Sequence, residues 1–129
     1  MVPEKLAFSP LGRCLIEADF SGSHISSDAG LLLLREVDKH HGLTRHLAGA
    51  LNDSRTSPKV RHSLPSRVAQ RVYGLAAGYE DFNDHQQLRF DQILQSAIGR
   101  DQPLAGKSTL SRMERGVDRQ AVVEAHRVM

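Results

Sequence analysis

A chain of 129 residues with 40% hydrophobic residues is long enough for one domain with a modest, mainly aliphatic core, because only 5% of its residues are aromatic. Its single cysteine, Cys14, excludes an internal disulfide, and no run approaches the ~20 apolar residues of a membrane span. These features predict a cytoplasmic protein with no membrane partner, and the formal net charge of +2 alone points to no particular ligand.

The first predicted element is a strand over residues 13–20, in which Ile16, Ala18 and Phe20 alternate with polar side chains. A period of two places such residues on one face of a half-buried strand. A strand needs a partner, and residues 5–10 are the nearest candidate. We therefore expect a small N-terminal β element.

The next predicted element is a helix with Ser27 as its N-cap and Gly42 as its stop. Its buried stripe is predicted to contain Leu31, Leu34 and Val37, which repeat at helical spacing, and Leu33 is a further candidate for it. The chain from here onward carries helical periodicity, which predicts a mainly α-helical fold.

A second short helix, capped by Thr44, is expected to end near Asn52. After a polar loop over residues 53–63, a third helix is predicted from about Pro65 towards Gly78. Its apolar stripe repeats at spacings of three and four and consists of Val68, Val72, Leu75, Ala76 and Tyr79.

The stretch between Asp53 and Glu80 contains no acidic residue but five basic ones, in addition to His62. The five are Arg55, Lys59, Arg61, Arg67 and Arg71, the last two on the outer side of the third helix. Such a stretch is a candidate patch for phosphate contacts. The alternative is a solvated face whose charges pair with acids elsewhere in the fold.

The segment GYEDFNDHQQLRFD at 78–91 concentrates acidic side chains around one imidazole, namely Glu80, Asp81, Asp84 and Asp91 with His85. Such groups could converge on a metal ion. Helix capping and loop solvation account for them without a metal, because the helix is broken here: Asp84 with Gln87 has the spacing of a capping box, and Asp91 can cap a helix that ends at Gly99. We therefore predict no metal site here.

Three of the six aromatic residues also fall in this part of the chain. We predict that a small apolar set packs the third helix against the helices after it, comprising Tyr79, Phe82, Leu88 and Phe90.

The segment AGKSTLSRMER predicts a helix that is capped by Ser108 and stopped by Gly116, followed by a final helix capped by Asp118. A short helix that starts Ser-Thr-Leu-Ser-Arg after a glycine is typical of the recognition helix in helix-turn-helix proteins. Its candidate DNA contacts are Lys107, Ser108, Thr109 and Arg112, with Leu110 and Met113 packed inward. The alternative is that Ser and Thr serve only as helix caps.

Three segments of the chain resemble the N-terminal region of bacterial insertion-sequence transposases of the DDE group-one type. They are DAGLLLLREVDKHHGL at 28–43, HSLPSRVAQRVYGLAAGYEDFNDHQQLRFD at 62–91 and LAGKSTLSRMER at 104–115. The string GYED-x-ND-H-x-x-LR-x-D is the most specific of these features, whereas residues 117–129 match no motif of the family.

The resemblance implies a protein that binds transposon ends and cuts and joins DNA. Catalysis in the family uses Asp and Glu side chains of an RNase H-like fold, which hold two divalent metal ions, magnesium being expected. In the family, these carboxylates lie after the segment similar to 104–115, beyond the stretch that this chain covers. The resemblance therefore implies no catalytic residue, no metal site and no cofactor in this chain.

Together these observations predict a single domain over 1–129, a compact bundle of short helices over 27–129 with a small β element. The expected function is the DNA-binding N-terminal portion of a transposase, which recognises transposon ends and could form a homodimer. A protein-interaction module that regulates or inhibits a nucleic-acid machine is the alternative, which the near-neutral net charge leaves open. A third class is a metal-dependent nuclease that would use the acidic residues of 80–91. The sequence does not favour it, because these carboxylates are not carried on predicted strands.

Overall fold

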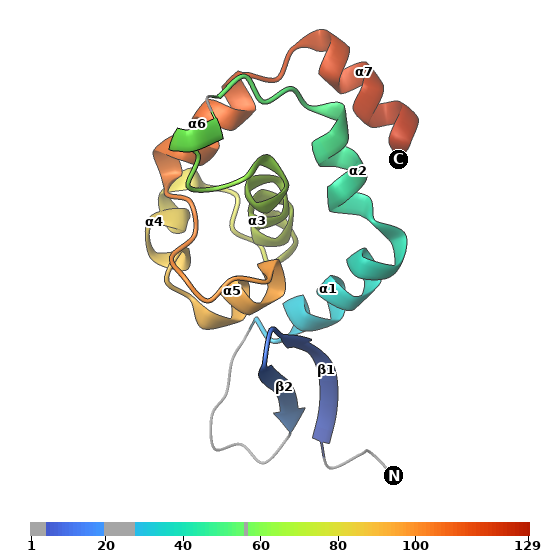
Figure 1. Ribbon diagram of the computed structural model, residues 1–129, viewed down its shortest axis with the longest axis vertical. Helices are drawn as coiled ribbons and strands as arrows, with labels where there is room; N and C mark the ends of the chain where they lie inside the picture. Colours follow the sequence, from blue (N-terminus) through green and yellow to red (C-terminus); the bar gives the residue numbers. More distant parts are fainter. Residues whose placement is uncertain (1–4, 20–27, 56) are drawn as a thin grey trace.

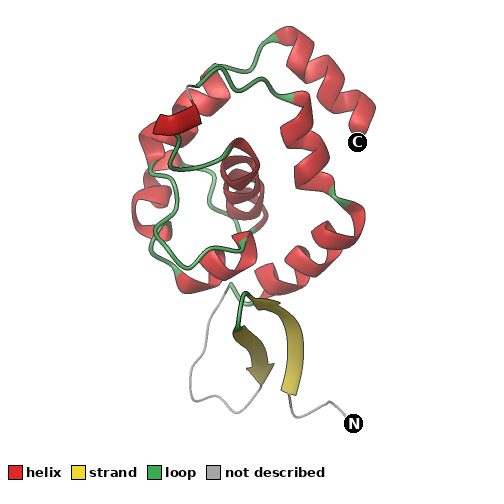
Figure 2. Ribbon diagram, in the orientation of Figure 1, coloured by secondary structure: helices red, strands yellow, loops and turns green. Residues whose placement is uncertain are grey.

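The computed structural model describes residues 5–19, 28–55 and 57–129, and these form a mainly helical fold with a small N-terminal hairpin, as predicted (Figures 1 and 2). Phe20 and Ser27, to which the predictions gave roles, lie outside the described residues. The strands are β1 (Lys5–Leu11) and β2 (Cys14–Asp19). The helices are α1 (Gly30–His41), α2 (Leu43–Ala50), α3 (Leu64–Ala76), α4 (His85–Leu88), α5 (Gln92–Ile98), α6 (Lys107–Arg115) and α7 (Arg119–Val128), with the 3-10 turns η1 (Ser57–Lys59) and η2 (Phe82–Asp84). None of these helices is both long and apolar enough to cross a membrane.

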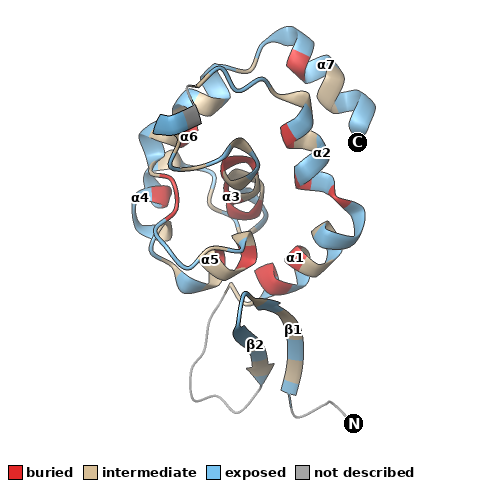
Figure 3. Ribbon diagram, in the orientation of Figure 1, coloured by how far each residue is buried: buried red, intermediate tan, exposed pale blue. Residues whose placement is uncertain are grey.

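Helix α3 lies at the centre of the helical body, with the other helices around it and the hairpin beyond α1 (Figure 1). The buried positions fit this arrangement, because they concentrate on α3 and on the sides of the other helices that face it (Figure 3). The main core cluster joins α1, α3, α5 and the segment before α6, and consists of Leu31, Tyr73, Leu94, Ala97 and Leu104.

The hairpin pairs β1 with β2 in antiparallel register, which confirms the predicted strand and its partner. Phe8 lies opposite Ile16, and Leu6 lies opposite Ala18. Ile16 and Ala18 are half-buried, whereas Leu15 is 81% exposed. The alternation of the sequence therefore corresponds to two faces, of which one is only partly covered.

The hairpin is fastened to α1 by hydrogen bonds around a single serine. The backbone N–H and the hydroxyl of Ser9 donate to the Glu36 carboxylate at 3.0 and 2.8 Å. In return, Arg35 Nη1 donates to the Ser9 carbonyl at 2.9 Å. The bonds from Ser9 lower the pKa of Glu36, so the contact uses an ionised carboxylate at neutral pH.

This contact also changes the buried face of α1. Leu31 is buried and Leu34 half-buried as predicted, but Val37 is 55% exposed and the prediction for it was wrong. Arg35 takes the inward position instead, at 5% exposure, because its guanidinium reaches the hairpin backbone. The helix ends at Gly42, whose φ of 69° is left-handed, as predicted.

Asp38 ties three helices together. Thr44 was predicted to cap α2, but the helix begins at Leu43, and both the N–H and the hydroxyl of Thr44 donate to Asp38. The Tyr73 hydroxyl on α3 donates to the same carboxylate at 2.7 Å. Burial alone raises the pKa of Asp38, but these bonds outweigh it and lower the pKa below 3.8.

We expect that replacing Asp38 with Asn lowers the free energy of unfolding by about 1.5–3 kcal/mol at pH 7, the usual range for bonds to a charged group. A lowered folded-state pKa contributes stability above pH ~4, and this contribution is lost as the pH falls through the folded pKa. Urea denaturation at pH 7 and pH 3 should therefore show a difference that shrinks in acid. A difference independent of pH would contradict this role.

Helix α3 begins with Ser63 as its N-cap, whose hydroxyl accepts from the Ser66 N–H, close to the predicted start at Pro65. Its faces differ from the prediction. Leu75 is 46% exposed, and Ala76 is also exposed. The buried residues of α3 are Arg67, Val68, Gln70, Tyr73 and Gly74. Because neighbours surround α3 on several sides, polar side chains with partners occupy inward positions that periodicity alone assigns to solvent.

The 80–91 segment contains the predicted caps in part. Asp91 caps α5 by accepting from the Leu94 N–H at 2.8 Å, and α5 ends at the left-handed Gly99. Asp84 makes no capping bond, so the predicted capping box is wrong. Asp81 has that role instead, because it accepts from the Asn83 N–H at the start of η2.

The predicted aromatic set is only partly buried. Tyr79, Phe82 and Leu88 are half-buried, and Leu88 packs against the core cluster. Phe90 is 57% exposed and lies beneath the guanidinium of Arg89, so its predicted packing role was wrong.

The last two helices have clear local signals. Helix α6 ends at Gly116 as predicted, but its N-cap is Gly106 rather than the predicted Ser108, which lies inside the helix. Asp118 caps α7 by accepting from the Ala121 N–H at 2.8 Å, as predicted.

Gly74 allows α3 and α4 to approach closely. A Cβ at Gly74 would lie 2.8 Å from Cε1 of His85, whose ring is fully buried. We expect Gly74→Ala to lower the free energy of unfolding by about 1–3 kcal/mol, because a rigid buried ring cannot move aside. Gly49→Ala on α2 is the matched control, since its Cβ would meet nothing within 4 Å and should raise stability by ~0.5–1 kcal/mol. Urea denaturation tests both, and equal gains would refute the close approach.

Candidate nucleic-acid interface

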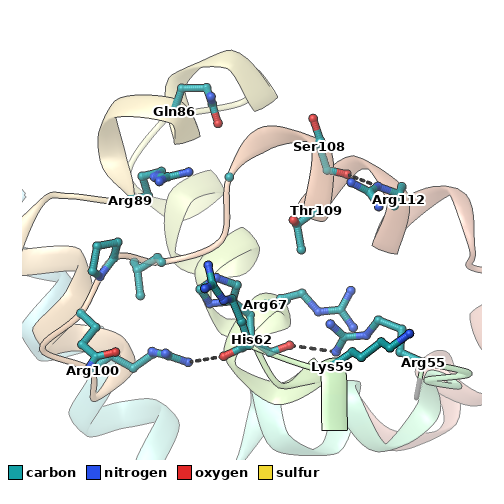
Figure 4. A pocket seen from close by; sticks show the side chains of 15 residues that line it. Arg55, Lys59, His62, Arg67, Gln86, Arg89, Arg100, Ser108, Thr109 and Arg112 are labelled. Atoms are coloured by element: carbon teal, nitrogen blue, oxygen red, sulfur yellow. Dashed lines mark hydrogen bonds between the residues drawn. The ribbon is translucent and has the colours of Figure 1, made fainter. Parts of the chain in front are cut away.

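A groove of about 910 Å³ opens between the segment before α3, the α4–α5 region and the start of α6 (Figure 4). We call it the basic groove, because seven of the side chains that line it are cationic and no acidic side chain is among the described residues that line it. The seven are Arg55, Lys59, Arg61, Arg67, Arg89, Arg100 and Arg112. The other lining residues are polar or neutral and include His62, Gln86, Ser108 and Thr109.

The segment that forms one wall is held by arginine contacts. Arg55 binds Asp53 through Nε and Nη2, each at 2.7 Å, and Nη2 also donates to the His62 carbonyl at 2.8 Å. Arg100 Nη1 donates to the Arg61 carbonyl at 3.4 Å. The paired guanidinium lowers the pKa of Asp53 to about 2, so this carboxylate stays ionised and keeps Arg55 in place.

The floor of the basic groove consists of His62, Arg67 and Arg89. Arg67 is the most enclosed, with a side chain that is 5% exposed, and its Nη2 lies 3.4 Å from Asp53. One buried nitrogen of each floor residue has no hydrogen-bond partner in the described part of the chain, namely Nδ1 of His62, Nε of Arg67 and Nε of Arg89. The floor is therefore a cluster of nitrogen atoms whose hydrogen-bonding capacity is not used within the protein.

The charges around His62 affect its protonation. Burial lowers the pKa of His62 below its usual 6.5, and the nearby guanidinium groups lower it further. These groups belong to Arg100, Arg61, Arg89 and Arg55. The imidazole is therefore neutral at pH 7, and the positive charge of the basic groove comes from the arginines and Lys59.

The opposite wall depends on a buried amide. Gln70 is 1% exposed, accepts from the Ala105 N–H at 3.0 Å and donates to the Ala105 carbonyl at 2.8 Å. This pair of bonds holds the segment before α6 against α3. As a result, the N-terminal end of α6 faces the groove, where the helix dipole favours negative charge.

The basic groove brings together seven of the nine predicted DNA contacts, which are Arg55, Lys59, Arg61, Arg67, Ser108, Thr109 and Arg112. Arg112 is exposed, and its Nε donates to the Ser108 carbonyl of its own helix at 3.2 Å. Figure 4 shows Arg112, Ser108 and Thr109 on one side of the groove and Arg55 and Lys59 on another.

Two predicted contacts lie elsewhere. Arg71 is not on the outer side, because its side chain is only 12% exposed: its Nε binds Glu114 at 2.6 Å, and its guanidinium lies 4.3 Å from the centre of the Phe82 ring. Lys107 donates to the Asn83 side chain at 3.0 Å and does not line the basic groove. These two side chains join α6 to neighbouring elements.

Sequence reasoning missed Arg89 and Arg100. Arg89 lies near Asp91, and Arg100 directly precedes Asp101, so counting charges along the chain cancels both. In space, the Asp91 carboxylate caps α5 while both arginines line the groove. The usable signal was the end of each short helix, because α4 and α5 each deliver one arginine just past their last turn.

The described residues of the acidic segment do not come together as a set of metal ligands. His85 is fully buried with its Nδ1 3.3 Å from Gln70, whereas Asp81 and Asp84 are exposed. Among the described residues, no group of three or more His, Cys, Asp or Glu side chains could hold a metal ion. The two divalent ions implied by the resemblance thus find no fitting ligand set in this part of the chain.

The family model for "Transposase DDE domain group 1" matches residues 8–129. The chain therefore belongs to this transposase family, and the match includes residues 117–129, for which the sequence offered no motif. No curated protein and no solved structure matches the chain.

Gly106 leaves room for Arg89, the floor residue of the basic groove that directly follows α4. A Cβ at this position would lie 2.7 Å from Gln86 Oε1 and 3.1 Å from Arg89 Nη1. Both atoms end flexible side chains, so Gly106→Ala should leave the fold intact but displace Arg89. We expect the affinity for the polyanion heparin at low salt to fall roughly 3–10-fold, or about 1 kcal/mol.

Fluorescence titration measures this change, with Gly30→Ala as the control because its Cβ would meet nothing within 4 Å. Unchanged heparin affinity in Gly106→Ala would show that Arg89 does not contribute to anion binding.

Proposed function

We propose that this chain is a DNA-binding portion of a transposase and that it binds transposon ends through the basic groove. The observation that carries the proposal is the convergence of seven cationic side chains from separate segments on one groove whose described lining has no carboxylate. Cations that repel one another are stabilised together when a polyanion lies between them. Membership of the transposase family makes DNA the expected polyanion.

The walls of the groove divide the work of binding. Lys59 and Arg61 are exposed and suit contacts with successive phosphates, which position the DNA without reading its sequence. Arg112 and the hydroxyls of Ser108 and Thr109 come from the first two turns of α6 and could reach base edges. Arg112 would have to exchange its bond to the Ser108 carbonyl for one to a base, which requires only a rotamer change.

Catalysis is not part of this proposal. We expect no magnesium-dependent DNA cleavage by this chain alone, because Asp81 and Asp91 act as caps and the His85 ring packs against α3. Asp81 accepts from Asn83 through both carboxylate oxygens, and Asp91 accepts from the Leu94 N–H through Oδ1.

A protein-interaction module remains the second candidate. An apolar groove of about 300 Å³ between α2, α3 and α7 favours it, with Val72, Leu75 and Val122 in its lining. This groove is separate from the basic groove, so the two candidates make different predictions for binding to DNA.

The proposal is tested by fluorescence anisotropy of transposon-end and random duplexes at several salt concentrations. If about four or five phosphates are engaged, the log–log slope should be roughly −4, near −0.9 per phosphate. Arg100→Gln and Lys59→Gln should each weaken binding to both duplexes and flatten the slope by about one unit. Arg112→Ala should cost about 1–3 kcal/mol on the transposon end and little on random DNA.

The matched control is Arg127→Gln, which removes the same charge from α7, where Arg127 pairs with Glu124 at 2.7 Å outside the basic groove. It should leave the salt slope unchanged. Equal losses for the control and the groove variants would mean that net charge alone explains binding. No DNA binding at low salt would reject the proposal in favour of the protein-interaction candidate.

A further inference from the structure

The floor of the basic groove differs from its rim. Buried polar atoms in proteins are almost always hydrogen-bonded, yet each of the three floor residues leaves one buried nitrogen unpaired within the described residues. The Arg67 side chain is only 5% exposed, so its position is set by the fold rather than by solvent. Leaving such a donor unsatisfied costs about 1–3 kcal/mol, which an acceptor would recover after a small side-chain movement that opens the buried nitrogen to the groove.

The chemistry of the missing acceptor is set by the donors. Nε of an arginine can only donate, and the His62 ring, neutral in the free protein, donates from both nitrogens once it takes up a proton. The ligand must therefore supply several acceptor oxygens and negative charge within a small volume. A phosphate group has this chemistry, and guanidinium groups are the side chains best shaped to bind it.

We propose that His62, Arg67 and Arg89 form a built site for one phosphate group, and that the exposed Lys59 and Arg61 act on the DNA mainly through their charge. This inference rests on the proposed function, because the phosphate would be one phosphodiester of the bound DNA. The site specifies one phosphate position, which in turn sets the register of the DNA along the groove.

Binding at this site has a consequence for protons. In the free protein the pKa of His62 is lowered by burial and by the surrounding arginines. The charged groups around it are Arg55 with its partner Asp53, Arg61, Arg89 and Arg100. A phosphate beside the ring offsets these positive charges and raises the pKa, so DNA binding should take up a proton.

The direction of the pH dependence follows because the pKa of His62 is higher in the complex than in the free protein. Affinity should rise as the pH falls through the pKa of the complex and level off below the pKa of the free protein. Because at most one proton is involved, the rise should stay below about tenfold per pH unit. Phosphodiesters do not titrate near neutral pH, so the proton must come to the protein.

Isothermal titration calorimetry of the full chain with duplex DNA, in buffers of different ionisation enthalpy at pH 7, measures the proton uptake. We expect between zero and one proton for the unmodified protein and none for His62→Asn, which keeps a polar nitrogen near Nδ1 but cannot titrate. His41→Asn, at an exposed position of α1, is the control and should leave the proton uptake unchanged.

A second measurement tests whether the directed hydrogen bonds of the Arg89 guanidinium are needed, rather than its charge alone. Arg89→Lys keeps the charge but removes the guanidinium Nε, so the salt slope should be preserved while the affinity falls roughly tenfold. Lys59→Arg at the rim should change neither. Arg89 is preferred to Arg67 here because it is only half-buried, and its replacement spares the contact between Arg67 and Asp53.

The outcomes separate the two proposals. If the unmodified chain binds no DNA at low salt, the proposed function and this inference fail together. If it binds DNA with the expected salt slope but takes up no proton, and Arg89→Lys binds as well as the original, the phosphate site is refuted and the proposed function stands.

Discussion

The arrangement of the basic groove depends on one buried amide, the side chain of Gln70. It satisfies both backbone groups of Ala105 and lies 3.3 Å from His85 Nδ1, so α3, α4 and the segment before α6 meet at this point. A buried amide with both ends bonded fixes distance and orientation, which an apolar contact of equal area would not. Leucine in its place would leave the N–H and carbonyl of Ala105 unpaired in the interior.

The basic groove places several positive charges close together, and this arrangement affects the stability of the fold. Four guanidinium groups surround His62, and the Asp53 carboxylate offsets one of them, that of Arg55, while it also contacts Arg67. Their mutual repulsion opposes folding, and the core cluster around Tyr73 and Leu94 must compensate for it. A binding site that is complementary to a polyanion is thus a source of strain in the free protein, as is common for functional sites.

Local signals in the sequence predicted the element ends better than the element faces. Asp91 and Asp118 cap helices and Gly42 and Gly99 end them, because capping depends on a few neighbouring backbone groups. Faces depend on the partners of a helix in space. Val37 and Leu75 are apolar yet exposed, while Gln70 is polar yet buried with partners far along the chain.

The candidate site shows the same division. The basic stretch from Arg55 to Arg67 was predictable because its charges are adjacent and have no acidic neighbours. Arg71 satisfied the same criterion but binds Glu114, which lies 43 residues later, and no local rule anticipates that pairing. Arg89 and Arg100 were missed for the opposite reason, since each has an acidic neighbour in the sequence, although the Asp91 carboxylate near Arg89 caps α5 and both arginines line the groove.

The attachment of the hairpin has its own consequence. A two-stranded hairpin is marginal in water, and this one is joined to α1 mainly through the bonds that Ser9 makes with Arg35 and Glu36. The folded state of the hairpin therefore depends on its bonds to α1. The hairpin can open without disturbing the core cluster. The backbone amides of β2 should then exchange with solvent through this local opening, whereas those of α3 should exchange only on global unfolding. The hairpin and the helical core therefore form two separate cooperative units.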